Sequence, residues 1–309
     1  MNQVLNSIAS VERETGIGKD TLRVWEKRYG FPIPARNARG ERLYPAAQIE
    51  QLILVKRLLD KGNRPGKVVG LDCAALENML VDEAVVVTAS EPHIGVLFEL
   101  IKTHQALSLR LALGRNLLER GIQLFLSTTV APLSRLVGDA WMRGEIRIFE
   151  EHLYTEQMSA VLSAAISMGH DIKGSPRVLL TTLPGEEHAL GLKMAEALLC
   201  AQGAGCLMLG VQTPITEIVS AVQAHHSDIV ALTFSEAVAA QQVKAGLQQL
   251  RYALPDEVVL WVGGAGVMRQ RDAINGVQFM ATHADLIPAV TAWRKTQGVP
   301  AEKFISKQD

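Results

Sequence analysis

The chain has 309 residues, enough for two or three domains, with 48% hydrophobic and 20% charged residues. Its formal net charge of −1 argues against binding nucleic acid along the whole surface, but it permits one basic module on a neutral body. No apolar run reaches the ~20 residues of a membrane span. The first ten residues lack the features of a signal peptide, and the three cysteines lack metal-ligand or disulfide spacing. We therefore expect a cytoplasmic protein.

The N-terminal part of the sequence is basic and has the pattern of a helix-turn-helix. Residues 8–15 and 19–29 are predicted to form two short helices, separated by a glycine-flanked turn at residues 16–18. The second helix of such a motif lies in the major groove of DNA. Basic residues gather again between residues 36 and 44, which suits a hairpin lying against phosphates, and a longer helix is predicted over residues 46–61.

One stretch of this module is specific enough to indicate a family. Residues 22–31 (LRVWEKRYGF), followed by Arg36, Gly40, Arg42 and Tyr44, resemble the winged helix-turn-helix of MerR-type transcription regulators over residues 1 to about 75. The resemblance implies double-stranded operator DNA as a partner, with salt-sensitive phosphate contacts and specific base contacts. The residues expected to contact DNA are Lys19, Thr21, Arg23, Lys27, Arg28, Tyr29, Arg36, Arg39, Arg42 and Tyr44.

The middle of the chain is predicted to be helical. Residues 81–90 are typical of a linker, and residues 93–169 carry apolar side chains every three or four positions, which predicts a bundle of about four helices. Trp141 lies in this bundle, and the pair Glu151-His152 follows it after nine residues. Taken alone, Trp141 suits a core aromatic residue, and His152 suits a surface or cap position.

Five apolar, partly β-branched runs alternate with helical segments in the rest of the chain, which predicts a parallel sheet with crossover helices. The runs are residues 178–183, 206–211, 229–234, 258–262 and 277–281. Ligands of such sheets bind outside the carboxyl ends of the strands. Ser235 follows the third run and Gly263-Gly264 the fourth. This glycine pair is a weak phosphate-loop signal, and close backbone approach to a flat ligand explains it equally well.

The motif Glu186-x-His188-x-x-Gly191 follows the first of these runs, at the same predicted sheet edge. A neutral imidazole held by a neighbouring carboxylate is how proteins present histidine to a metal. Glu186 is expected to accept the other ring N–H of His188. Taken alone, His188 is better explained as an ordinary histidine at a helix start.

Together, the two motifs resemble the cobalamin-binding domains of CarH-like and LitR-like photoreceptor regulators, in which a helical cap precedes a flavodoxin-like domain. The resemblance implies adenosylcobalamin as the cofactor. It places Trp141, Glu151 and His152 on the upper, adenosyl-bearing face and His188 below, as the ligand of cobalt. The residues expected to line the slot for the displaced nucleotide tail are Gly191, Ser235, Gly263 and Gly264.

The sequence thus predicts a multidomain α and α/β protein. Residues 1–80 are expected to form the winged helix-turn-helix, residues 81–172 a helical-bundle cap, and residues 173–309 a Rossmann-like, flavodoxin-type cobalamin domain. We expect no enzyme but a repressor that binds adenosylcobalamin. The resemblance further implies that light removes the adenosyl group and changes the oligomer, a dimer or tetramer of this chain.

Alternatives stay open at this point. The family's histidine directly after the tryptophan, which binds cobalt from above once the adenosyl group is lost, is replaced by Met142 here. Two regulators of the same architecture are therefore alternatives: one senses cobalamin or oxygen-linked changes, and the other is controlled by a protein antagonist. A third alternative is a corrinoid-carrying enzyme subunit. The basic helix-turn-helix and the lack of a substrate-binding barrel argue against it.

Overall fold

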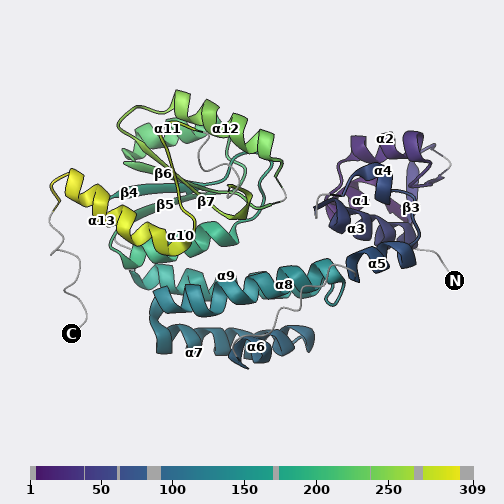
Figure 1. Cartoon of the computed structure of the whole chain (residues 1–309), viewed down its shortest axis with the longest axis horizontal. Helices are drawn as coiled ribbons and strands as arrows, with labels where there is room; N and C mark the ends of the chain where they lie inside the picture. The colour runs from purple at the N-terminus through teal and green to yellow at the C-terminus, as the bar shows by residue number, and fades with distance from the viewer. Residues whose placement is uncertain are drawn as a thin grey trace. The chain divides into compact units, whose positions relative to one another are not determined.

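The computed structural model describes residues 5–37, 39–60, 63–81, 92–169, 174–236, 238–267 and 274–299. They form two compact units (Figure 1): the N-terminal part together with residues 139–146, and the remaining helical segment together with the α/β part. The division into three domains at residues 80 and 172 stays a prediction, and the predicted linker lies almost wholly outside the described residues. Among the described helices, none combines the length and apolarity that crossing a membrane requires.

The helix-turn-helix forms at the predicted boundaries. Its helices are α1 (Ile8–Thr15) and α2 (Lys19–Tyr29). The Ser7 hydroxyl caps α1 by accepting a hydrogen bond from a backbone N–H of the first turn. Gly16 and Gly30 end the two helices in the left-handed conformation that glycine adopts without strain. Local signals therefore suffice to define this motif.

A small antiparallel sheet forms the wing of the N-terminal unit, in the order β1-β3-β2. The predicted basic hairpin is confirmed as β2 (Ala35–Arg36) and β3 (Arg42–Pro45), whereas β1 (Leu5–Ser7) was not predicted. The long helix α3 (Ala46–Asp60) follows directly, as expected. Two shorter helices complete the unit: α4 (Pro65–Val68) and α5 (Cys73–Val81).

The helical segment contains the four predicted helices. They are α6 (Pro92–Lys102), α7 (Ala106–Phe125), α8 (Ala131–Arg143) and α9 (Ile148–Gly169). One difference from the prediction is a π-helical turn, η1 (Leu126–Val130), which joins α7 to α8 without a loop. Helix α7 packs against α6 and α9.

The α/β part is built on a five-stranded parallel sheet with the order β5-β4-β6-β7-β8. The strands are β4 (Arg177–Thr181), β5 (Gly205–Gly210), β6 (Ile229–Thr233), β7 (Val259–Gly263) and β8 (Val277–Phe279). All five predicted runs are confirmed. This is the flavodoxin-like order, in which the connections change direction between the first and third strands. That switch point, the favoured place for a ligand, lies between β4 and β6.

Helices cover both faces of this sheet (Figure 1). Helices α10 (Leu190–Ala201) and α13 (Leu286–Thr296) lie on one face and contact each other, and α11 (Ile215–His225) and α12 (Ala240–Ala253) lie on the opposite face. Helix α9 packs directly against α10. The helical segment and the sheet are therefore joined through the helix that follows the Glu186-His188 motif.

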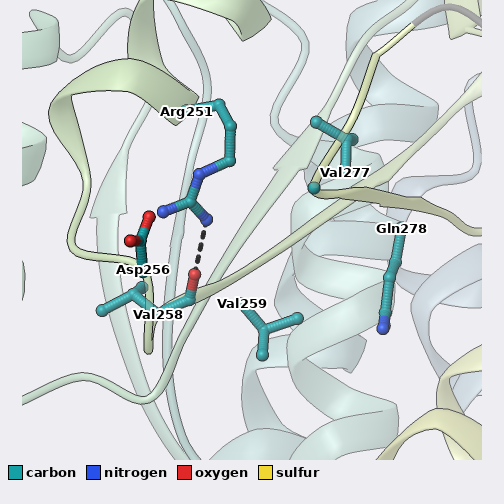
Figure 2. A pocket seen from close by; sticks show the side chains of 7 residues that line it. Arg251, Asp256, Val258, Val259, Val277 and Gln278 are labelled. Atoms are coloured by element: carbon teal, nitrogen blue, oxygen red, sulfur yellow. Dashed lines mark hydrogen bonds between the residues drawn. The ribbon is translucent and has the colours of Figure 1, made fainter.

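A hollow of about 410 Å³ opens at the amino ends of β7 and β8 (Figure 2), opposite the predicted ligand edge. Arg251 dominates its polar lining, together with Asp256 and Gln278. The guanidinium of Arg251 donates to the Val258 carbonyl at 2.6 Å and to two further carbonyls. Arg251 therefore ties the end of α12 to the start of β7, which is a structural task.

Candidate functional site

The loop after β4 holds an imidazole on a buried carboxylate. The Glu186 side chain is 1% exposed, and its Oε1 accepts the backbone N–H of His188 at 2.9 Å. The same oxygen lies 2.6 Å from Nδ1 of the His188 ring, which is 65% exposed. Among the described residues, Nε2 of this ring has no hydrogen-bond partner. The expected carboxylate–imidazole pair is thus present, with one ring nitrogen left for a ligand.

The same carboxylate ties together the two loops at the switch point of the sheet. Oε2 of Glu186 accepts the backbone N–H of Ser235, in the loop after β6. The Thr182 hydroxyl, at the end of β4, donates to the Glu186 carbonyl at 2.6 Å. Glu186 is therefore anchored on both sides, and its position fixes the orientation of the His188 ring.

The electrostatics of the pair follow from this anchoring. Burial raises the pKa of Glu186, but hydrogen bonds from His188 and Ser235 outweigh burial and lower this pKa to about 2. Glu186 is consequently ionised at neutral pH. The hydrogen bond to Glu186 raises the pKa of His188 above its ordinary value. A carboxylate at Nδ1 in this way selects the tautomer and makes the free nitrogen a better metal ligand.

One residue of the predicted pair on α9, Glu151, lies near this loop. The charge of Glu151 contributes to raising the pKa of His188, which shows that the two groups lie near each other. The Glu151 carboxylate accepts the Thr155 hydroxyl at 2.8 Å and lies 3.6 Å from Nε2 of His152. Lys193 of α10 also donates to a serine hydroxyl of α9 at 2.8 Å. The structure thus brings Glu151 near His188, while the contact it shows for His152 is with Glu151 itself.

Trp141 belongs to the segment that groups with the N-terminal unit, and hence to a different unit from His188. The Arg57 guanidinium lies 4.9 Å from the centroid of the Trp141 ring, a cation–π distance. Arg57 is only 6% exposed, and burial lowers its pKa. The structure therefore gives Trp141 a partner on α3, and the role of Trp141 above a cofactor stays a prediction.

The residues predicted to line a slot gather at the carboxyl ends of β6 and β7. The Ser235 hydroxyl is buried without a hydrogen-bond partner among the described residues, although it lies near enough to Glu186 to help lower the pKa of that carboxyl. A Cβ added to Gly191 would lie 3.6 Å from the Thr233 side chain. An orphaned hydroxyl and a free imidazole nitrogen fit a corrinoid with a nucleotide tail, because they offer the tail a hydrogen bond and cobalt a ligand.

Most side chains predicted to contact DNA are exposed. Those of Thr21, Arg23, Lys27 and Arg28 are exposed along α2, while Arg36 and Arg39 are exposed on the wing. The remaining predicted residues make contacts within the N-terminal unit itself. Lys19 pairs with Glu12 at 3.0 Å, and Arg42 pairs with Glu26 at 2.7 Å, which links the wing to α2. Tyr29 is half-buried, with the Arg28 guanidinium 5.3 Å from its ring.

One residue predicted to contact DNA, Tyr44, is buried instead. The expectation that it contacts DNA is wrong for this conformation, because the residue is 0% exposed and belongs to the core of the N-terminal unit. Tyr44 pairs with Asn6 of β1, a strand that the sequence did not predict. Burial raises the pKa of its hydroxyl. Tyr44 therefore stabilises the wing from inside.

Replacing Arg23 by alanine is expected to weaken DNA binding and to reduce the dependence of log K on log salt by about 0.9, because one phosphate contact is lost. Arg23 is exposed and only paired with the exposed Asp20 at 2.8 Å, so the fold should not change. Fluorescence anisotropy at several salt concentrations measures both quantities. Arg115→Ala, which removes an exposed arginine from α7, is the matched control. An unchanged salt slope for Arg23→Ala would remove Arg23 from the interface.

Comparisons with known proteins agree with this organisation. Residues 7–70 match the MerR HTH family regulatory protein model, and residues 176–289 match the B12 binding domain model. The HTH-type transcriptional repressor CarH of Myxococcus xanthus is 29% identical over 259 residues, covering 81% of this chain and 85% of CarH. The HTH-type transcriptional repressor CarA of the same organism is 26% identical over 313 residues, covering 95% of this chain and 99% of CarA.

A solved structure supports the fold. The monomethylamine corrinoid protein of Methanosarcina barkeri covers 63% of this chain and 96% of its own, with a TM-score of 0.51 at 19% identity. At that identity the likeness concerns the helical and parallel-sheet architecture alone.

The chain is therefore a DNA-binding transcriptional regulator with a cobalamin-binding domain. It is homologous to CarH and CarA, both of which are named HTH-type transcriptional repressors. The B12-binding domain indicates a cobalamin or related corrinoid as the cofactor.

Proposed function

We propose that this regulator is a repressor that holds adenosylcobalamin through His188 and responds to light. The observation that carries the proposal is the Glu186–His188 pair at the switch point of the sheet, with Nδ1 at 2.6 Å from a buried carboxylate. Cobalt readily accepts an imidazole nitrogen, and Nε2 is the nitrogen that the pair leaves free. The buried, unpartnered Ser235 hydroxyl is the second support, because it offers the nucleotide tail a hydrogen bond.

The upper face is assigned to Trp141, Glu151 and His152. Glu151 lies near enough to His188 to help raise its pKa, which supports placing this pair over a ligand seated on His188. Trp141 supplies a large flat surface for an adenosyl group. When bound, adenosylcobalamin supplies a cobalt–carbon bond that light breaks homolytically. Loss of the adenosyl group would change the packing around Trp141, Glu151 and His152. Because Glu151 and His152 lie on α9, this change would shift α9 against the other helices of the helical segment.

Oligomerisation would convert this packing change into regulation. In the dark, the loaded chain is proposed to form a dimer or tetramer in the cytoplasm, so that several DNA modules bind one operator together. Linking modules raises apparent affinity by about 10²–10⁴ without new contacts. Disassembly in the light therefore suffices to release DNA.

The test is the absorption spectrum and the solution mass of purified protein, measured with adenosylcobalamin in the dark and after illumination. We expect a spectrum of protein-ligated cobalamin in the dark and a smaller assembly after light. Cofactor uptake with identical mass in dark and light would favour a cobalamin-sensing regulator. This alternative is open because Met142 stands where the photoreceptor family has the histidine that binds cobalt from above. A free-cofactor spectrum would overturn the proposal and favour regulation by a protein antagonist.

Replacing Glu186 by glutamine is expected to weaken cofactor binding by about 10–100-fold, as loss of the partner of a metal-bound histidine does. The amide no longer selects the tautomer that leaves Nε2 free. Titration followed by absorbance measures the affinity. Glu187→Gln is the matched control, because Glu187 is exposed and accepts a hydrogen bond from Gln212 at 3.1 Å, not from the His188 ring. Equal affinities of the two variants would contradict the orienting role of Glu186.

A further inference from the structure

A histidine outside the predicted set lies next to the first turn of α10. His283 begins a 3-10 turn, η3 (His283–Asp285), that runs directly into α13. Its Nε2 lies 3.4 Å from the Gly191 carbonyl oxygen, three residues after His188. A capping box formed by Thr282 and Asp285 fixes this turn. The backbone thus holds the His283 ring against the residue at which the predicted tail slot begins.

The surroundings of His283 define its chemistry. The ring is partly buried, and burial lowers its pKa below the ordinary value, so it is neutral at neutral pH with one N–H donor and one acceptor nitrogen. The π-helical turn η1 contacts η3. His283 therefore lies where the helical segment, the start of α10 and the start of α13 meet, on the α10 face of the sheet.

The contact with Gly191 is one that a ligand can replace. At 3.4 Å it is longer than the usual 2.7–3.2 Å of an N–H···O hydrogen bond, so it is weak. Gly191 contributes no side chain, and the Thr233 side chain is the nearest group to where its Cβ would stand. The buried Ser235 hydroxyl, two residues along the chain from Thr233, has no hydrogen-bond partner among the described residues. The predicted slot thus includes an unpartnered hydroxyl on Ser235, and Gly191 at its start is contacted by an exchangeable donor.

We propose that His283 is a binding residue for the nucleotide tail of the corrinoid, which it contacts after giving up the Gly191 carbonyl. The proposal rests on the proposed cofactor function. A nucleotide tail carries phosphate and ribose oxygens, which accept the hydrogen bond that a neutral imidazole donates. His283 would then favour complete corrinoids over those that lack the nucleotide, while His188 serves both.

The experiment compares two probes, cobalamin and cobinamide, the corrinoid without its nucleotide. For His283→Ala we expect the affinity for cobalamin to fall about 10-fold, as loss of one hydrogen bond implies, with the affinity for cobinamide unchanged. His283→Gln keeps an N–H donor and should recover part of the preference. His225→Ala, which removes an exposed histidine at the end of α11, should leave both affinities unchanged. Circular dichroism of the cofactor-free variants checks the fold.

Two results would overturn the proposal. Equal losses for cobalamin and cobinamide in His283→Ala would assign His283 a structural role, and unchanged affinities for both would assign it none. Failure of the proposed function is a separate outcome, because wild-type protein would then bind neither probe.

Discussion

Replacing His188 by alanine is expected to lower the affinity for cobalamin by about 100-fold or more, which corresponds to at least about 2.7 kcal/mol. Loss of a residue that merely orients a metal ligand costs 10–100-fold, and His188 is proposed as the ligand itself. The ring is exposed at the sheet edge and Glu186 is held independently by the Ser235 N–H. The fold should therefore survive the substitution, and the loss should be confined to binding.

The spectrum supplies the decisive measurement for His188→Ala. Any cofactor that still binds should lack the absorption of imidazole-ligated cobalt, and added imidazole should restore that absorption in part, because it can occupy the vacated position. The matched control is Glu187→Ala, which truncates the neighbouring exposed side chain. Wild-type affinity and spectrum in His188→Ala would eliminate His188 as the ligand of cobalt.

Local signals explain why much of the fold was predictable. The boundaries of α1 and α2 coincide with the prediction, because Ser7, Gly16 and Gly30 are cap residues whose preferences act within a few residues. The five strands of the large sheet were predictable because buried parallel strands are short apolar runs. Since strand ends in such a sheet share one edge, the sequence also predicts that the loops of Glu186 and Ser235 meet there.

Features that depend on distant pairing were not predictable. Strand β1 has three residues, too few for a periodicity, and it exists because Leu5 pairs with Pro45. The burial of Tyr44 follows from that pairing. His283 carried a usable signal, since it closely follows the last strand at the same sheet edge as the other loops. Its contact with Gly191, however, depends on α13 and α10 packing together, which no local pattern shows.

Replacing Gly264 by alanine is expected to lower the free energy of unfolding of the sheet by about 3 kcal/mol or more. Gly264 has a φ of +96°, and an added Cβ would collide with the Phe234 carbonyl oxygen and lie 2.9 Å from the Phe234 nitrogen. Backbone atoms cannot move aside as the end of a flexible side chain can. The loops after β6 and β7 would have to separate, and amide hydrogen exchange in both strands should become about 100-fold faster without cofactor.

Gly263 is the matched control for this prediction, because it is the adjacent glycine in the same motif. Its φ is not positive, and an added Cβ would lie 3.5 Å from the Met280 carbonyl oxygen, an ordinary contact. Gly263→Ala should therefore change the free energy of unfolding by less than about 1 kcal/mol, and any larger effect should appear in cofactor affinity. Equal amide exchange rates in Gly264→Ala and Gly263→Ala would contradict the prediction that only Gly264 is needed for stability. Close contact at Gly264 would then not be what holds the loops after β6 and β7 together. It would also not be what positions the Ser235 N–H that donates to Glu186.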